Sequence, residues 1–395
     1  MRSLKRHYCF RHWTKRALAF CLDFLGFFLT FPFRIFRKTL PSKPVKRILL
    51  IRLDHIGDVV MTRPAMRNLR RRFPQAQIDL LISKDIIPLF EGDPVIDTMI
   101  GMDPHWFSRK PGWRKILPET RRILSYLRKK KYDLGIDFRG DVRHIALMSL
   151  AGIPYRLGYG ITGGGFLLSR ECDYDFSRHQ VFNNLKLLEC LGVEQIPESV
   201  PFVYSARREK EFWDKFAAEI GWIPRPHILI HAGAGYPSKR WPAGSFAALI
   251  HKILEEKLGQ VVLIGTLDEI SLLPEIMPAA GRLVDLRGKT SLGDLPVLFD
   301  HTDVFIGNDS GPAHIAAAQG LDSIVIFSGT NDAGVWHPWN ERLRLMTHPV
   351  PCAPCEAREC PLGHHACVDP ISVENVSTAL REVLKNKGQN SSERK

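Results

Sequence analysis

The sequence predicts an α/β protein with two Rossmann-like domains, each built on a parallel sheet, that face each other across a cleft. Short apolar runs alternate with amphipathic helical stretches, a pattern typical of parallel sheets with right-handed crossovers. The alternation occurs once before residues 197–208 and starts again after them. The length of 395 residues also suits two domains of ordinary size.

The first series begins with the apolar run 47–53, which we expect to be a buried strand. A turn at 55–57 then leads into a helical pattern that extends from 58 to 73. Two further strands are predicted at 78–83 and 132–138, the second after a strongly basic helix at 119–131.

The second series repeats this theme with strands of similar length. The predicted strands are 227–233, 260–265, 283–288, 303–308 and 323–329, and an amphipathic helix is expected at 245–259. We therefore predict four parts: a basic and apolar N-terminal segment, an N-terminal domain, a C-terminal domain and a disordered tail. Their predicted bounds are 1–44, 45–205, 206–385 and 386–395.

The charge of the chain is concentrated at its N-terminus. The formal net charge is +13. Residues 1–47 contain twelve Lys or Arg residues and one acid, Asp23, which leaves a charge of only +2 for residues 48–395. A nearly neutral body excludes a nucleic-acid binder with a basic surface throughout. The basic segment instead suggests an anionic partner for the N-terminus.

Residues 17–33 of this segment are apolar apart from Asp23. The stretch is marginal for a membrane-spanning helix, which needs about 20 apolar residues. A cleaved signal peptide is the rival interpretation, but no small-x-small cleavage site follows. A helix that packs on the rest of the protein is another interpretation. We favour an interfacial helix whose aromatic side chains and flanking basic residues contact the anionic headgroups of a membrane.

Two common nucleotide-binding motifs are absent from the strand-to-helix turns. The turn at 231–242 has Gly233 and Gly235 but carries Ser238 where a dinucleotide-binding motif needs a third glycine. The Gly288-Lys289 pair lacks the earlier glycine of a P-loop. Neither a dehydrogenase nor a P-loop NTPase is therefore supported.

Three other turns carry residues suited to proton transfer or to phosphate binding. The first places Asp58 at the start of a helix, where the helix dipole and nearby amides are expected to hold it ionised as a general base; a plain helix-end acid is the alternative. The second carries Lys239 and Arg240 after two glycines and suggests a diphosphate site without a metal, or else a basic surface loop.

The third turn follows the strand 303–308 and opens a helix. Asn308, Asp309 or Ser310 can cap that helix, and its free N–H groups, including that of Gly311, form a typical phosphate site. Two further residues are expected on the same rim, namely His314 and Thr330. An ordinary helix cap is the alternative for this stretch.

Together, the stretches 49–83, 231–242 and 306–320 resemble glycosyltransferase family 9, the heptosyltransferases of lipopolysaccharide core assembly. The resemblance covers about residues 46–385 and leaves the N-terminal segment outside. It implies a GT-B fold with an N-terminal acceptor domain and a C-terminal nucleotide-sugar domain. It also implies inverting transfer from ADP-heptose to a lipid-linked saccharide, with no metal or other cofactor required for catalysis.

The resemblance also implies roles for single residues. Asp58 matches the family's catalytic base, Lys239 its phosphate-contacting lysine, and Asp309 to His314 its donor-binding motif, D-[ST]-G-x-x-H. His55 and Arg63 depart from the small or apolar residues common beside the base, so a different acceptor is an open alternative.

Three arginines near acceptor-domain turns are candidates to bind an anionic saccharide, and a solvated basic face is the alternative for each: Arg63, Arg139 and Arg143. The donor nucleotide also stays open, because the same fold uses UDP- or GDP-sugars as well. A nucleotide-binding scaffold without turnover is a further alternative.

Four of the eight cysteines lie close together, at Cys352, Cys355, Cys360 and Cys367. In a cytoplasmic enzyme this spacing suggests a structural zinc or iron–sulfur site, although it matches no single metal signature. Reduced thiols and an occasional disulfide are the alternatives.

Overall fold

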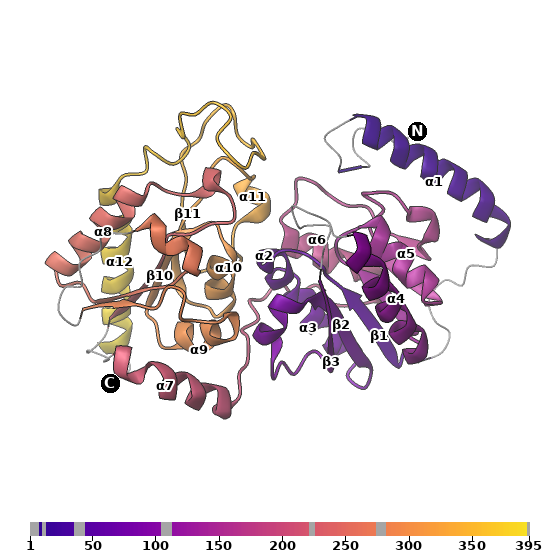
Figure 1. Ribbon diagram of the computed structural model, residues 1–395, viewed down its shortest axis with the longest axis horizontal. Coiled ribbons are helices and arrows are strands. Elements are labelled where there is room, and N and C mark those ends of the chain that lie inside the picture. Colours follow the sequence, from indigo (N-terminus) through magenta and orange to yellow (C-terminus); the bar gives the residue numbers. More distant parts are fainter. Residues whose placement is uncertain are drawn as a thin grey trace. The chain divides into compact units, whose positions relative to one another are not determined.

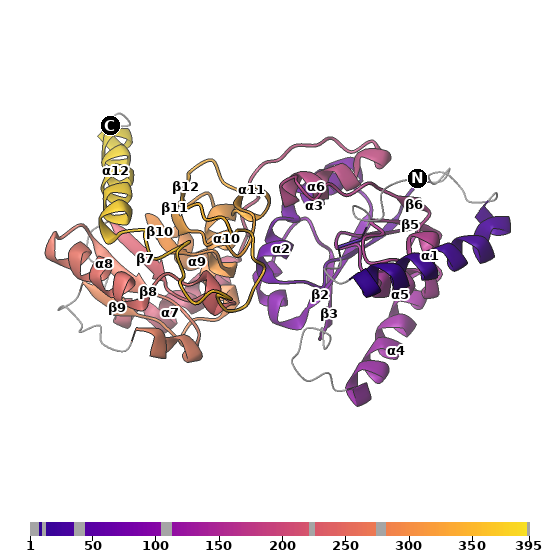
Figure 2. The same cartoon turned by 90° about the horizontal axis from the view of Figure 1, so that it is seen from above.

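The computed structural model divides the chain into two compact units, Met1–Glu198 and Ser199–Lys395. It describes residues 8–9, 13–34, 44–103, 113–220, 226–273 and 282–392. Each unit contains a six-stranded parallel sheet with helices packed against it (Figures 1 and 2). The predicted α/β class with two Rossmann-like sheets is confirmed.

The sheet of the first unit has the strand order β3-β2-β1-β4-β5-β6. Its strands are β1 (Arg47–Ile51), β2 (Gln77–Ser83), β3 (Thr98–Met102), β4 (Leu134–Asp137), β5 (Tyr155–Gly158) and β6 (Arg170–Glu171). The chain order reverses between β1 and β4, which pair in parallel with Ile51 opposite Asp137. In open α/β sheets, ligands bind at such a point, beyond the carboxyl ends of the strands.

The second unit repeats this topology in the order β12-β11-β10-β7-β8-β9. Its strands are β7 (His227–His231), β8 (Gln260–Leu263), β9 (Leu283–Asp285), β10 (Val304–Asn308), β11 (Asp322–Ile326) and β12 (Leu343–Met346). Here the order reverses between β7 and β10, with Gly307 opposite His231. Each unit therefore offers one site of the kind expected to hold a ligand.

Helices connect these strands. They are α1 (Trp13–Arg34), α2 (Ile56–Val60), α3 (Arg63–Arg72), α4 (Trp113–Lys130), α5 (Val142–Leu150), α6 (Gln180–Leu187), α7 (Ala206–Ile220), α8 (Ala243–Glu255), α9 (Leu295–Asp300), α10 (Gly311–Ala318), α11 (Ala333–Trp336) and α12 (Val373–Ser392). The single helix predicted at 58–73 is wrong, because the chain breaks there into α2 and α3. Pro64 lies in the first turn of α3, where a missing N–H costs no helical hydrogen bond.

Both units are held together by apolar strands buried between helices. In the second unit, strand residues such as Ile228 and Ile306 pack with Trp241 and Phe246 of the α8 region and with α12. α12 continues to Ser392, so the disorder expected for 386–395 does not hold for the described part of that tail. The core contacts of α12 reach Val383 and Leu384, and the good helix formers Lys385 and Lys387 follow them.

The N-terminal helix α1 packs against the 3-10 helix η4 (Gly165–Leu167) of the first unit. In the views of Figures 1 and 2, it lies beside α5. Within the described ranges, no helix has the length and apolar character that crossing a bilayer requires.

Candidate functional site

The predicted base, Asp58, lies just beyond the carboxyl end of β1, on the short helix α2. The guanidinium of Arg52 contacts it, with 3.0 Å between Nη2 and Oδ1. Arg52 also donates to the carbonyl oxygen of Phe138 at 2.6 Å and lies 3.6 Å from a carboxylate oxygen of Asp54. Arg139 approaches the other oxygen of Asp54 at 3.0 Å. Two carboxylates and two arginines thus form one network at the switch point of the first sheet.

The environment of Asp58 differs from the one predicted. We expected the helix dipole and backbone amides to keep this carboxyl ionised. Instead, burial and the neighbouring carboxylate of Asp54 raise the pKa of Asp58 above its usual value, and the charges of Arg52, His55 and Arg139 oppose this only in part. A raised pKa makes the ionised form a stronger proton acceptor, which suits a general base.

Two of the three predicted acceptor arginines border this network. Arg139 donates to the carbonyl oxygen of Leu53 at 2.9 Å and is one-quarter exposed. Arg143, in the first turn of α5, is about half exposed and donates from Nε to Asp141 at 2.8 Å. Both side chains are therefore partly exposed, and guanidinium groups of this kind can bind phosphate or carboxylate oxygens.

The third arginine does not fit the predicted role. Arg63 is buried, with 3% of its side chain exposed, and forms an ion pair with the equally buried Asp93. Its guanidinium also lies over the ring of Phe90, 5.2 Å from the centroid. The expectation that Arg63 contacts the acceptor is therefore wrong: burial commits this charge to Asp93 and to the packing of α3.

The Arg63→Met variant should mainly lose stability. Removing one partner of a buried ion pair leaves Asp93 uncompensated, which costs about 3–5 kcal/mol. Urea unfolding should show this loss, and Arg63→Met/Asp93→Asn should regain part of it. At a temperature where the double variant is folded, its KM for the acceptor should stay within about threefold of wild type. A larger rise in KM would show that Arg63 does contact the acceptor.

Three of the predicted donor residues come together at the switch point of the second sheet. Lys239 Nζ lies 2.6 Å from Oδ2 of Asp309, and His314 Nε2 lies 3.7 Å from Oδ1. Burial works against ionisation of Asp309, but the contact with His314 and the charge of Lys239 outweigh it and lower the pKa of this carboxyl. The contact with Asp309 thereby holds the lysine side chain at the end of β10, next to the start of α10.

The first turn of α10 has the open N–H groups of an anion site. Ser310 is the N-cap residue, but no side chain caps the helix. The Ser310 hydroxyl lies 3.2 Å from His231 Nδ1, while the Asn308 side chain accepts from the backbone N–H of Trp241 at 2.9 Å. The polar residues expected to cap the helix are thus used elsewhere. The amides that begin at Gly311 are left for a ligand such as a phosphate.

Thr330 does not line this site but contacts the turn that carries Lys239. It is buried, with 1% of the residue exposed, and its hydroxyl donates to Ser238 Oγ at 3.1 Å. Ser238 precedes Lys239 in the 3-10 helix η6 (Pro237–Lys239). The expected direct contact of Thr330 with the donor is therefore wrong for this structure, because hydrogen bonding within the protein occupies the buried hydroxyl.

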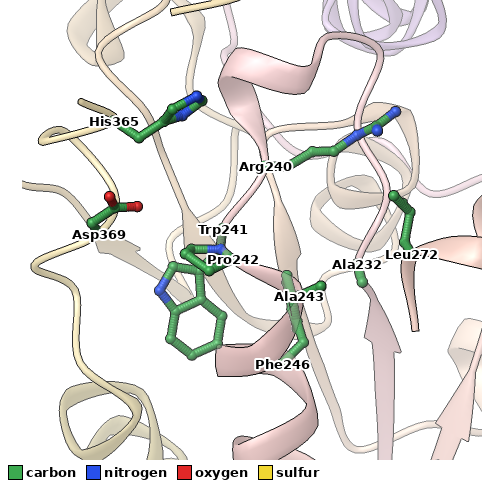
Figure 3. Close-up of a pocket in the computed structure, with 9 residues that line it drawn as sticks. All are labelled: Ala232, Arg240, Trp241, Pro242, Ala243, Phe246, Leu272, His365 and Asp369. Atoms are coloured by element: carbon green, nitrogen blue, oxygen red, sulfur yellow. The ribbon is translucent and has the colours of Figure 1, made fainter. Parts of the chain in front are cut away.

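Arg240 also lies apart from the group around Asp309. Its Nη2 donates to the carbonyl oxygen of Ala234 at 3.1 Å. The side chain borders a cavity of about 280 Å³, with His365 on the opposite side and Trp241 and Phe246 between them (Figure 3). Adjacent basic residues in the sequence thus point to two different places.

The sequence interpretation missed Glu269, which follows β8. Its Oε2 lies 3.3 Å from His231 Nε2 and accepts from the backbone N–H of Thr266 at 2.7 Å. Burial opposes ionisation, but the His231 hydrogen bond and the Thr266 amide lower the pKa of Glu269 to about 2. A Cβ at Gly233 would lie 1.8 Å from Oε1, so any larger residue there would displace the Glu269 carboxylate from this position. An acid after a strand of a Rossmann-like unit is a signal that could have identified it.

The cysteine-bearing loop packs against the Lys239 turn. The backbone N–H of Cys355 donates to Gly329, and that of Ser238 donates to the carbonyl oxygen of Arg358 at 3.1 Å. All four cysteines of this loop are free. Among the residues described, no group of three or more His, Cys, Asp or Glu side chains is placed to hold a metal ion.

Known proteins resemble this chain over most of its length. A sequence model of glycosyltransferase family 9 (heptosyltransferase) matches residues 120–366. Lipopolysaccharide heptosyltransferase 3 of Escherichia coli K12 is 28% identical over 304 residues, which cover 73% of this chain and 83% of that protein. Lipopolysaccharide heptosyltransferase 2 of the same strain is 25% identical, with coverages of 86% and 98%.

A solved structure, that of the E. coli ADP-heptose lipopolysaccharide heptosyltransferase II, superposes with a TM-score of 0.71 at 23% identity. The superposition covers 87% of this chain and 99% of that one. At this identity, the similarity establishes the shared fold.

Proposed function

Because this chain belongs to glycosyltransferase family 9, the heptosyltransferases, we propose that it transfers a heptose from an ADP-activated donor to a lipid-linked saccharide of the lipopolysaccharide core. The chain is a glycosyltransferase. The names of its relatives support heptose as the sugar and lipopolysaccharide as the product, and the name of the E. coli structure supports ADP-heptose as the donor. The observation that carries the proposal is the pair of charged clusters, one at each switch point.

The cluster of the first unit supplies the proton acceptor. With its pKa raised, ionised Asp58 takes the proton of an acceptor hydroxyl while the hydroxyl oxygen bonds to the anomeric carbon of the heptose. Arg139 and Arg143 keep exposed guanidinium groups for anionic groups on the acceptor. Attack from the side opposite to the leaving group inverts the configuration at that carbon.

The cluster of the second unit stabilises the leaving group. As the bond from the anomeric carbon to the diphosphate breaks, negative charge grows on the released ADP. Lys239 and the uncapped amides of α10 are placed to meet this charge, and His314 can donate a further hydrogen bond. In this scheme, the protein's own cations and dipoles do the work of a catalytic metal.

The proposed partners and location follow from this chemistry. The donor is a nucleotide-sugar, the acceptor is an anionic lipid-linked saccharide, and the reaction takes place at the inner surface of the cytoplasmic membrane. No nucleic acid is involved, in keeping with a net charge of only +2 for residues 48–395.

A donor panel tests the proposal. The purified full-length protein is incubated with radiolabelled ADP-heptose, UDP-sugars or GDP-sugars and with lipid-linked core saccharide extracted from cell envelopes. Label should enter the lipid fraction from ADP-heptose at least about tenfold faster than from any other donor. Faster transfer from a UDP- or GDP-sugar would show that this sugar, and not ADP-heptose, is the donor. ADP binding without transfer from any donor would favour a scaffold.

The four cysteines remain a predicted structural metal site. Backbone amides around Cys360, chiefly that of His365, lower the pKa of its thiol, and Cys352 and Cys355 are close enough to Cys367 to raise the pKa of that thiol further after burial. Cysteine thiolates are the usual ligands of zinc and iron. The lowered pKa favours the thiolate of Cys360, whereas the raised pKa disfavours that of Cys367. Protein purified without chelator should therefore contain about one zinc ion or one iron centre per chain, and a content near zero would exclude both.

A further inference from the structure

The N-terminal helix α1 carries its large apolar side chains on the outside. Eight of the sixteen exposed large hydrophobic residues among those described lie on this one helix of 22 residues. They are Trp13, Leu18, Phe20, Leu22, Phe24, Leu25, Phe28 and Leu29. A helix on a soluble domain normally buries such residues and exposes polar ones, so the pattern of α1 is inverted.

The buried side of α1 consists of small and polar residues. Ala19, Asp23 and Gly26 are buried and are spaced four and three apart, so they share one helical face. A Cβ at Gly26 would lie 2.5 Å from the ring of Phe166, which shows how closely the helix meets η4.

Asp23 fixes this helix to the first unit. Its two oxygens accept hydrogen bonds from the Tyr8 hydroxyl at 2.8 Å and from the backbone N–H of Gly164 at 2.6 Å. Only 5% of Asp23 is exposed. An acid within an apolar stretch is therefore explained by attachment to the loop that precedes η4, which leaves the opposite face of the helix free of carboxylates.

The N-terminal segment that contains this helix is strongly basic. Asp23 is the sole acid among residues 1–47, against twelve Lys and Arg, and it points inward. Lys15, on the helix itself, is exposed. A partner for this face must accept apolar and aromatic side chains and carry negative charge at the rim. A second copy of the chain would instead bring a segment of charge +11 against its equal.

We propose that the outer face of α1 is a docking surface for a bilayer of anionic lipids. Its Phe, Leu and Trp side chains enter the boundary between headgroups and acyl chains while the flanking basic residues meet lipid phosphates. The hydrogen bonds of Asp23 then hold the first unit at the lipid surface. This inference does not require the proposed sugar transfer, but it would bring the acceptor unit to the place where a lipid-linked acceptor resides.

Vesicle sedimentation of the full-length protein tests the surface. Vesicles of phosphatidylcholine with 30% phosphatidylglycerol, roughly the anionic content of a bacterial membrane, should bind the wild type at least about tenfold more tightly than phosphatidylcholine alone. The Phe24→Ser/Phe28→Ser variant removes two rings that are 67% and 74% exposed. It should bind the anionic vesicles about tenfold or more weakly.

The matched control is Leu267→Ser/Leu362→Ser, which removes two apolar side chains of similar exposure from the second unit. This variant should bind vesicles like the wild type, and circular dichroism should show that both variants are folded. Wild type that ignores anionic vesicles, or a Phe24/Phe28 variant that binds as well as the control, would overturn the proposal. The proposal would also be overturned if the wild type were a dimer and the Phe24→Ser/Phe28→Ser variant were a monomer. Because the assay measures binding alone, a failed sugar transfer leaves its result unchanged.

Discussion

The Asp58→Asn variant should lose roughly 100- to 10,000-fold in kcat while binding ADP like the wild type. Asparagine keeps the shape of the side chain but cannot accept the proton of the acceptor hydroxyl. ADP affinity should be unaffected, because the residues proposed to hold ADP lie in the second unit. Single-turnover transfer and calorimetric titration with ADP measure the two quantities separately.

The neighbouring Asp54→Asn variant is the matched control. It makes the same chemical change to a carboxylate that Arg139 holds at 3.0 Å, so its kcat should fall less than about tenfold. Both residues also predict the pH profile. Asp58 must be ionised to act, so kcat/KM should increase with pH and then level off. Because the pKa of Asp58 is raised, the midpoint of this increase should lie above the usual aspartate value of about 4.

Removing the Asp54 charge takes away one cause of the raised pKa, so this midpoint should move to lower pH in Asp54→Asn. The assignment of the base would be contradicted if kcat of Asp58→Asn stayed within a few-fold of the wild-type value. It would also be contradicted if the midpoint of the pH profile did not move in Asp54→Asn.

The Lys239→Met variant should lower kcat/KM by about 100- to 1,000-fold, as expected for removal of a group that meets charge in the transition state. ADP affinity should fall about tenfold or more, the usual loss for a hydrogen bond to a charged group. Transfer kinetics at saturating acceptor and calorimetry with ADP measure the two effects.

Loss of Lys239 also leaves Asp309, of which 3% is exposed, without its closest cation. Unfolding of Lys239→Met/Asp309→Asn separates this stability effect from catalysis, since the double variant should regain stability but not activity. Arg240→Met is the control for charge, because Arg240 lines a cavity whose lining includes neither Lys239 nor Asp309. If Arg240→Met loses as much ADP affinity as Lys239→Met, the phosphate site is wrongly placed.

The sequence alone predicted the fold well where the strands are apolar and central. Runs such as 47–53 and 303–308 are buried on both faces, so their composition identifies them without alternation. The strands β3, β5, β6 and β12, which lie at or next to the edges of the sheets, escaped detection, since they are short and partly exposed. The strand-to-helix turns also predicted Asp58, Lys239 and Asp309 as site residues, because ligands in parallel sheets meet the carboxyl ends of strands.

Only the tertiary structure decided what each polar group does. Arg63 and Arg143 are both arginines near acceptor-unit turns, yet packing buries one with Asp93 and leaves the other half exposed. Burial likewise reversed the expected direction of the Asp58 pKa, because desolvation depends on neighbours far apart in sequence. The composition of α1 marked it as apolar and basic, but only its packing against Gly164 and η4 showed which face is turned outward.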